Sequence, residues 1–213
     1  MATKPTGTNA VNEALGLPLA DAFERELTEA LEAAEGVHSV VLAMIDLDGF
    51  LMVNERYGMA AGDDVLIKTG EYLKGMLAQR GSLYRYSGDE FAAILIGVEK
   101  EDAFLMLEET RRGYNVKLPG GEATTITIGL SSAPEDATRY TELVRKAEGA
   151  MFRGKLNGRN RVCLAREEKM VTKTSHYTVE QLQRLTMLSK REGIGEAILL
   201  REALDALLKK YEV

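Results

Sequence analysis

The sequence predicts an α/β domain followed by a small C-terminal segment, and three observations lead to this prediction. Amphipathic stretches of helical spacing alternate with short apolar stretches along the first 165 residues. Two of the apolar stretches are separated only by the small and acidic residues 87–90, a pattern typical of a hairpin. The composition shifts near Arg166, where a charged stretch precedes two further helical patterns.

Each element is predicted from its periodicity and its flanking residues. Helical spacing of apolar residues predicts helices at 19–34, 62–80, 100–114 and 138–158. Short apolar runs predict strands at 38–46, 83–86, 91–96, 124–133 and 159–165. The continuous run at 38–46 is expected at the centre of the sheet and the last strand at its edge. In the C-terminal segment, Thr178 is expected to cap a first helix and Gly193 to end it, before a second helix.

Composition limits the classes of function. The 213 residues are 45% hydrophobic and 28% charged, as in an ordinary soluble protein, and the net charge of −6 argues against a general nucleic-acid trap. The single Cys163 excludes an intramolecular disulfide, and no apolar run approaches about 20 residues. We therefore expect a cytoplasmic protein without a membrane span. The expected divisions are a disordered leader over 1–11, one domain over 12–165 and a separate segment over 166–213.

Acidic residues gather where the predicted strands end. Asp46 closes the central strand and Asp48 follows it, while Asp89 and Glu90 lie in the hairpin turn. If the hairpin lies beside the central strand, three or four carboxylates converge, which is costly unless a cation neutralises them. Oxygen ligands without nearby His or Cys favour Mg²⁺ or Mn²⁺, and Mg²⁺ often completes its shell with substrate phosphates.

A basic pair decides how these acids are interpreted. Acids in turns are common because they are solvated there, so the hairpin pair alone is weak evidence of a site. Lys155 by itself would be an ordinary surface lysine. Lys155 and Arg159, however, stand four residues apart at a helix end and can share a face toward a triphosphate. A nucleoside triphosphate is therefore the expected kind of substrate.

Three motifs together resemble a known family. The stretches "VLAMIDLDGFLMVNERYGMAAGD" at 41–63, "RYSGDEF" at 85–91 and "KLNGRNRV" at 155–162 resemble the GGDEF domain of diguanylate cyclases, in order and spacing, over residues 12–165. The resemblance implies a palm-like fold with a central, mostly antiparallel sheet flanked by helices. It also implies an Mg²⁺-dependent enzyme that condenses two GTP molecules into cyclic di-GMP and pyrophosphate, working as a homodimer.

The resemblance also assigns roles to single positions. It implies metal ligands at three carboxylates and one backbone carbonyl, which are Asp46, Asp89, Glu90 and Leu47. Glu90 is further implicated in activating the ribose 3′-hydroxyl, so Asp46, Asp89 and Glu90 are the expected catalytic residues. The implied substrate contacts are Asn54 and Asp63 at the guanine edge, Gly88 beside the nucleotide, and Lys155 and Arg159 at the phosphates. An acid at position 63 accepts from guanine groups that adenine lacks, which argues against ATP and against a mixed cyclic dinucleotide.

Departures from the family pattern bear on activity. Ser87 replaces the first glycine of the signature turn, Leu51 replaces a lysine expected near the phosphates, and Met59 replaces a histidine. The N-terminal signature at 12–21 is retained only in part. The feedback site expected at 78–81 is missing from the sequence, so we expect weak or no product inhibition through it. The alternative to an active cyclase is a weak or inactive domain that serves as the nucleotide sensor of a DNA-binding regulator.

The C-terminal stretch "KTSHYTVEQLQRLTMLSKREGIGEAILLREALDALLKKY" resembles ribbon-helix-helix proteins. In that family a short strand pairs with its twin across a dimer and enters the DNA major groove. The resemblance implies DNA contacts on one face of this strand, either Lys173 and Ser175 or Thr172, Thr174 and His176. A helical hairpin that only dimerises is the alternative, and the nearly balanced charge of the segment is poor for strong phosphate binding.

Overall fold

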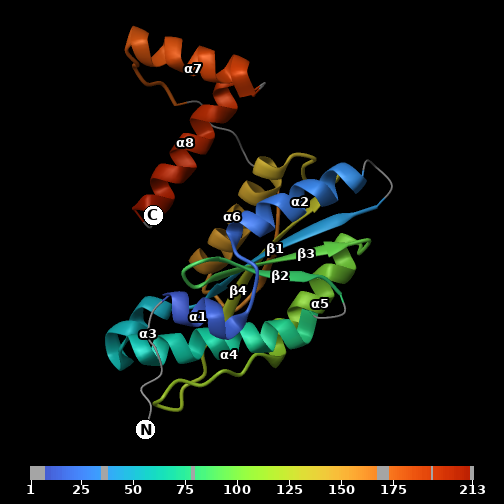
Figure 1. Cartoon of the computed structure of the whole chain (residues 1–213), viewed down its shortest axis with the longest axis vertical. Helices are drawn as coiled ribbons and strands as arrows, with labels where there is room; N and C mark the ends of the chain where they lie inside the picture. The colour runs from blue at the N-terminus through green and yellow to red at the C-terminus, as the bar shows by residue number, and fades with distance from the viewer. Residues whose placement is uncertain (1–7, 35–37, 78–79, 167–172, 193, 212–213) are drawn as a thin grey trace. The chain divides into compact units, whose positions relative to one another are not determined.

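The computed structural model describes residues 8–34, 38–77, 80–166, 173–192 and 194–211. The chain divides into two units, one up to residue 167 and one from residue 168 onward (Figure 1). This division lies within two residues of the one expected from the change of composition near Arg166.

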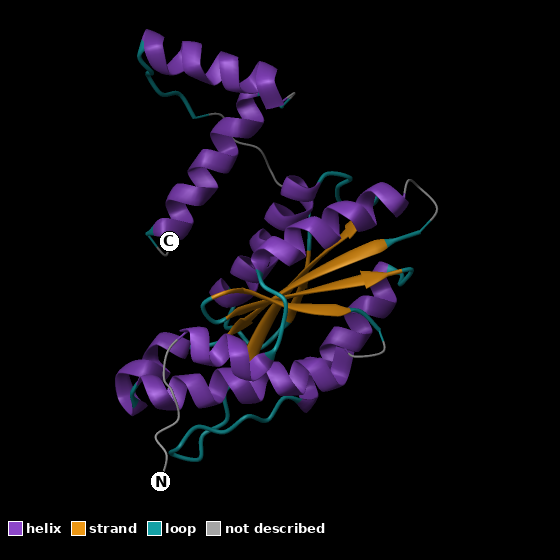
Figure 2. Ribbon diagram, viewed as in Figure 1, coloured by secondary structure: helices purple, strands orange, loops and turns teal. Residues whose placement is uncertain are grey.

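A five-stranded sheet forms the middle of the first unit (Figure 2). Its strands are β1 (Val40–Leu47), β2 (Ser82–Ser87), β3 (Glu90–Ile96), β4 (Ile126–Ala133) and β5 (Val162–Leu164). They lie in the order β2-β3-β1-β4-β5, and every pair is antiparallel except the parallel β4–β5 pair. The mostly antiparallel sheet, the central position of β1 and the edge position of β5 are confirmed.

Helices cover both faces of this sheet (Figure 1). One face carries α1 (Thr8–Leu15), α3 (Phe50–Tyr57), α4 (Met59–Leu77) and α5 (Lys100–Gly113). The other face carries α2 (Ala20–Ala34) and α6 (Tyr140–Leu156). Alternation along β1 separates the two cores, because Ala43 and Ile45 pack toward the first group of helices while Leu42 and Met44 pack toward the second.

Helix α1 corrects one expectation. A disordered leader was expected over 1–11, but residues 8–11 belong to α1, and residues 1–7 lie outside the described part. The cause is apolar burial, since Val11 and Leu15 are 1% and 5% exposed and pack into the same core as α4. Gly70 of α4 makes room for this helix, because a Cβ there would overlap the side chain of Leu15.

The second unit consists of α7 (Val179–Glu192) and α8 (Glu196–Lys210). The Oγ1 of Thr178 accepts from the amide of Gln181 at 3.1 Å, and the Thr178 amide donates to Oε1 of Gln181 at 2.9 Å. This reciprocal capping confirms Thr178 as the N-cap of α7. Gly193, the expected helix end, lies outside the described residues.

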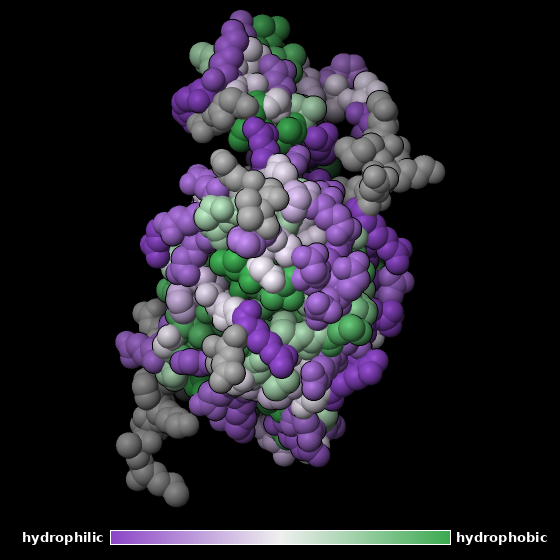
Figure 3. Space-filling view, turned by 90° about the vertical axis from the view of Figure 1, so that its right-hand side faces the viewer, coloured by the Kyte–Doolittle hydropathy of each residue, from purple (hydrophilic) through white to green (hydrophobic). Residues whose placement is uncertain are grey.

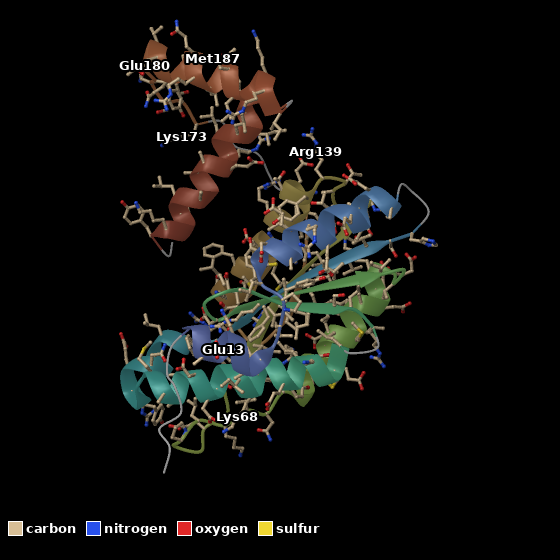
Figure 4. All side chains as sticks on the ribbon, in the orientation of Figure 1. Glu13, Lys68, Arg139, Lys173, Glu180 and Met187 are labelled. Atoms are coloured by element: carbon tan, nitrogen blue, oxygen red, sulfur yellow. The ribbon has the colours of Figure 1, made fainter. Side chains whose placement is uncertain are left out.

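The segment before α7 is irregular where the structure describes it. Residues 173–178 have no regular secondary structure, while residues 171 and 172 lie outside the described part (Figure 4, where Lys173 is labelled). A lone strand has no edge to pair with, so a ribbon requires a second chain.

The described residues of the second unit form no buried core. Of its residues whose exposure is described, none is buried. Large apolar side chains stand 40–74% exposed on its two helices, namely Val179, Leu182, Met187, Leu204, Leu207 and Leu208. Figure 3 shows such hydrophobic groups among hydrophilic ones on the surface of this unit. In the described parts of both units, no helix is both long and apolar enough to cross a membrane.

The close approach of α6 to β4 leads to a stability prediction. A Cβ on Gly129 would overlap the carbonyl oxygen of Ala147 and the amide of Met151, which are backbone atoms of α6. We expect Gly129→Ala to lower the free energy of unfolding by about 2 kcal/mol, because α6 must shift away from the sheet.

Urea unfolding of the full chain measures this effect. Gly75→Ala on α4 is the control, since a Cβ there meets open space and alanine favours the helix by about 0.5–1 kcal/mol. Equal stability of Gly129→Ala and the wild type would contradict the prediction.

Candidate active site

The carboxylates of β1 and of the hairpin meet at one end of the sheet. The β1–β3 register pairs Asp46 with Glu90, and Asp89 precedes Glu90 in the turn. The amide of Leu47 donates to the carbonyl of Asp89 at 3.4 Å, which ties the turn to the end of β1. The hairpin therefore lies beside the central strand, as expected.

Asp46 is the most deeply buried of these acids. It is 5% exposed, and its Oδ2 accepts from Nζ of Lys155 at 2.6 Å. Burial raises the pKa of Asp46 to about 7, although Lys155 lowers that pKa and the charges of Asp89 and Glu90 raise it. The ammonium of Lys155 thus does not offset the cost of burying the ionised carboxylate of Asp46. A further positive charge beside it would favour the ionised form.

The donor set at this end of the sheet fits a hard divalent cation. It consists of carboxylate oxygens with a strand-end carbonyl, which suits Mg²⁺ because Mg²⁺ keeps several ligands from water and phosphate. Among the described residues no three acidic, His or Cys side chains stand gathered as a metal cluster, and Lys155 lies against one oxygen of Asp46. The assignment of Asp46, Leu47, Asp89 and Glu90 as ligands stays a prediction.

Asp48 does not join the other carboxylates. Its Oδ1 accepts from the hydroxyl of Thr127 at 2.7 Å. Its Oδ2 accepts from the hydroxyl of Thr125 at 2.7 Å and from the amide of Asn160 at 3.1 Å. The charges of Asp89 and Glu90 therefore act on Asp46, whereas Asp48 is hydrogen-bonded to β4 and to the turn after α6.

The signature turn is held from within. Gly88 has φ +23°, and its carbonyl accepts from Nη2 of Arg85 at 2.8 Å. Ser87, which replaces a glycine of the family pattern, donates from its hydroxyl to Oε2 of Glu90 at 2.7 Å. The serine therefore adds a hydrogen bond to an expected catalytic acid.

Arg85 is a buried cation that sequence reasoning missed. It is 6% exposed, and its Nη1 donates to Oδ1 of Asn12 at 2.7 Å. Burial lowers the pKa of the Arg85 guanidinium, and the charges of Asp63 and Asp89 act in the opposite direction. The positive charge of Arg85 thus interacts both with Asp63, the acid expected at guanine, and with Asp89, an expected metal ligand. An arginine within the apolar hairpin strand was the available signal, because a buried arginine needs partners.

The residues expected at guanine lie where α3 meets α4. A Cβ on Gly62 would overlap Oδ1 of Asn54, so the two helices approach closely there. This Oδ1 is buried and has no hydrogen-bond partner among the described residues. Asp63, half-buried, follows Gly62 on α4. A buried acceptor without a donor is costly, so a ligand that donates to Asn54 would stabilise this corner.

The expected phosphate residues lie at the end of α6. Lys155 is in its last turn, and Arg159 is exposed in the following turn with φ +59°. Leu51 and Met59, which replace cationic or titratable residues of the family pattern, are 63% and 64% exposed. The structure thus provides two cations from α6 and its turn and apolar side chains at the two replaced positions.

Two further expectations fall outside this site. Lys173 and Ser175 belong to the second unit, where both are exposed. Of the missing feedback site, Ala78 and Gln79 lie outside the described residues, while Arg80 and Gly81 precede β2.

The raised pKa of Asp46 predicts a pH effect on stability in the metal-free protein. Between its usual pKa of 3.8 and the folded value of about 7, the unfolded chain loses this proton while the folded chain keeps it. The free energy of unfolding therefore falls as pH rises, by about 2 kcal/mol between about pH 5 and pH 7. Asp46→Asn lacks this proton and should lack this part of the decline.

Urea unfolding in the presence of a chelator, at both pH values, measures the difference between wild type and variant. Parallel pH dependence of the two proteins would rule out a raised Asp46 pKa.

Comparisons with known proteins agree with this geometry. Residues 15–161 match the family model described as diguanylate cyclase, GGDEF domain, and residues 172–212 match that of a ribbon-helix-helix domain. The chain is 33% identical over 138 residues to diguanylate cyclase A of Treponema denticola, covering 63% of this chain and 37% of that protein. It is 32% identical over 149 residues to diguanylate cyclase TpbB of Pseudomonas aeruginosa, covering 67% of this chain and 34% of that protein. The chain therefore spans about a third of the length of these curated relatives.

Solved structures show the same fold. The GGDEF domain of TpbB from Pseudomonas aeruginosa superposes with a TM-score of 0.68 at 31% identity, covering 72% of this chain and 99% of that one. The coiled coil and GGDEF domain of DgcB from Caulobacter crescentus, in complex with c-di-GMP, gives 0.65 at 27% identity, covering 75% and 85%. With the sheet order, the paired acids of β1 and β3 and the match over most of the first unit, these findings show that the chain belongs to the GGDEF domain family.

Proposed function

We propose that this chain is a diguanylate cyclase that condenses two GTP molecules into cyclic di-GMP with release of two pyrophosphates. The observation that carries the proposal is the pairing of Asp46 with Glu90 across β1 and β3, with Asp89 beside them and the ammonium of Lys155 2.6 Å from Asp46. A site that combines carboxylate oxygens with the cationic side chains of Lys155 and Arg159 suits a magnesium nucleotide.

Each residue has a role in this chemistry. Asp46, Asp89 and the carbonyl of Leu47 would hold Mg²⁺ or Mn²⁺, which when bound favours the ionised 3′-hydroxyl and offsets charge on the phosphates. Glu90, oriented by Ser87, would accept the proton of the 3′-hydroxyl. The 3′-oxygen forms a bond to the α-phosphorus of the other GTP as the bond to its pyrophosphate breaks.

The cations at the end of α6 would bind the phosphates. Lys155 now bonds Asp46, so a cation that takes this carboxylate frees the ammonium for a phosphate oxygen. Arg159 is exposed four residues further along and presents a second, planar donor. Together they would offset charge that builds up on the leaving pyrophosphate.

Base selection is proposed for the corner between α3 and α4. Asp63 accepts hydrogen bonds only, as guanine N1–H and its amino group require, and Asn54 has a buried oxygen that lacks a donor. Adenine offers Asp63 neither an N1–H nor an amino group at the corresponding position, so it would form fewer hydrogen bonds at this corner than guanine does. GTP is therefore the proposed substrate, and ATP a poor one.

A homodimer is proposed because two nucleotides must face each other and because none of the second unit's residues with described exposure is buried. Its exposed leucines on α7 and α8 are too many for a stable segment of this size alone. Pairing with a second copy would bury them. The same pairing would hold two cyclase domains at millimolar effective concentration.

DNA binding through the second unit is a second candidate function. It is favoured by the match of residues 172–212 to a ribbon-helix-helix domain, a family in which paired strands enter the major groove. Lys173 and Ser175 are exposed in the segment before α7, where such a strand would form in the dimer.

The cyclase proposal predicts the products of the purified full chain. With Mg²⁺ and labelled GTP we expect cyclic di-GMP and pyrophosphate, with little product from ATP, as measured by chromatography. Asp89→Ala should lower the rate at least about 100-fold, because it removes a carboxylate that neutralises the metal. Asp102→Ala, an exposed acid in the first turn of α5, is the matched control and should leave the rate unchanged.

Absence of any cyclic product from GTP, or an unaffected Asp89→Ala, would sink the cyclase proposal. Guanine-nucleotide binding without turnover would favour the sensor alternative, in which the domain reports a nucleotide to the DNA-binding unit.

The DNA proposal predicts a salt-dependent gel shift of duplex DNA by the full chain. Lys173→Ala should weaken the shift and reduce the slope of log affinity against log salt by about 2, one phosphate contact for each chain of the dimer. Lys190→Ala, in the last turn of α7, is the matched control. Light scattering on the same samples separates loss of DNA contact from loss of the dimer. A salt slope equal to the wild type would contradict the assignment of Lys173.

A further inference from the structure

The turn after α6 has an unusual backbone. Gly158, Arg159 and Asn160 follow one another with φ of +103°, +59° and +46°. Two successive non-glycine residues in the left-handed region are unfavourable for L-amino acids, so the turn persists only because other contacts hold it. Arg159, the exposed residue proposed to bind phosphate, lies in the middle of this turn.

The amides of the turn show what holds it. Those of Gly158 and Arg159 donate back to α6, to the carbonyls of Lys155 at 3.4 Å and Gly154 at 2.9 Å. The amide of Asn160 instead leaves the helix and donates to Oδ2 of Asp48 at 3.1 Å. The Asn160 side chain accepts from Nη1 of Arg111 at 2.8 Å. The turn is thus anchored on one side by Asp48, which follows β1, and on the other by Arg111 of α5.

Asp48 is itself fixed on the sheet. The hydroxyls of Thr125 and Thr127 donate to its two oxygens at 2.7 Å each, and its amide donates to the carbonyl of Thr125 at 2.9 Å. Its carboxylate therefore has little freedom, and the Asn160 amide is held against a rigid acceptor.

We propose that Asp48 is a positioning residue that fixes the turn after α6, so that Arg159 is held ready for the phosphates of the nucleotide. The proposal rests on the phosphate-binding role proposed above for Arg159. Asp46 and Asp48 then both hold the stretch from the end of α6 into the following turn. Asp46 bonds Lys155 at 2.6 Å and Asp48 bonds the Asn160 amide, and Arg159 lies between these two anchored residues in the sequence.

The energetic reason is the cost of ordering a long side chain. A free arginine at an exposed turn loses backbone and side-chain freedom when it binds a ligand. A turn that is already fixed has lost the backbone part of this freedom before the nucleotide arrives. Releasing the turn should therefore weaken binding of the phosphates without changing the contacts of the base.

Asparagine at position 48 separates this role from metal binding. Its Oδ1 can accept from Thr125 and Asn160 as Oδ2 of Asp48 does, while its amide nitrogen donates to the hydroxyl of Thr127, which can turn to accept. Asp48→Asn should therefore keep the turn, whereas Asp48→Ala removes the acceptor. A metal carboxylate would tolerate neither change.

Calorimetry on the full chain with Mg²⁺ tests the proposal, using a GTP analogue whose α–β bridge is a methylene group and guanosine as a probe without phosphates. We expect Asp48→Ala to weaken the analogue about 10-fold, close to the effect of Arg159→Ala, and to leave guanosine binding unchanged. Asp48→Asn should stay within about 3-fold of wild type. The double variant with Asp48→Ala and Arg159→Ala should bind no more weakly than Arg159→Ala alone, because Asp48 acts through Arg159.

Several outcomes would overturn the proposal. Full additivity in the double variant, or unchanged analogue binding by a folded Asp48→Ala, would show that Asp48 does not act through Arg159. Equal losses in Asp48→Asn and Asp48→Ala would identify a carboxylate role instead. No analogue binding by wild type, or no effect of Arg159→Ala, would remove the proposed function itself, and with it this proposal.

If circular dichroism shows that Asp48→Ala does not fold, a second pair of variants at Thr125 tests the same proposal. Thr125→Val removes one donor that holds Oδ2 of Asp48, and Thr125→Ser restores it. We expect the valine variant to bind the analogue about 3-fold more weakly and the serine variant to bind it as wild type does. Equal binding by the two variants would count against the proposal.

Discussion

The ion pair between Asp46 and Lys155 joins the end of β1 to the end of α6 at 2.6 Å, and the geometry of the active-site edge depends on it. A buried ionised carboxylate beside two further acids is costly, so it is stabilised either by a cation close by or by protonation. In the chain alone Lys155 is the cation. In the proposed enzyme a metal would take that place, and the lysine would turn to the phosphates of the same substrate.

Two sets of hydrogen bonds, one made by Arg85 and one by Asp48, hold the segments on either side of this ion pair. Neither side chain takes part in the proposed reaction. On the hairpin side, the buried Arg85 bonds the carbonyl of Gly88 and so shapes the signature turn. On the other side, Asp48 bonds β4 and the turn after α6. Both satisfy polar backbone groups in irregular segments, which otherwise would carry the cost of unpaired hydrogen-bonding groups. The reacting groups thereby lie at the ends of regular elements whose positions are set by the two cores.

The second unit stands in contrast to this well-packed domain. Its helix α7 is capped by Thr178 and Gln181, so its local structure is well determined, yet none of its residues with described exposure is buried. In an intertwined dimer the helices of each chain are locally ordered, and their apolar side chains are buried only against the partner chain. The proposed cyclase needs two domains face to face, and a dimeric second unit would supply that proximity without any contact between the active sites themselves.

The sequence by itself determined most of the secondary structure and the identity of the acids, because helical and strand periodicity and strand-end positions are local properties. It predicted the central strand, the hairpin, the edge strand and the cap at Thr178. It missed α1 and α3, since Val11 and Leu15 of α1 and Val53 of α3 are buried only by packing against other elements of the same core. Only the tertiary structure decided what each polar group bonds. Asp48 and Asn160 are 112 residues apart, and Asp46 and Lys155 are 109 apart. Two acids separated by one residue thus have different roles, because the strand ends at Leu47 and the chain then turns Asp48 toward β4 and α6.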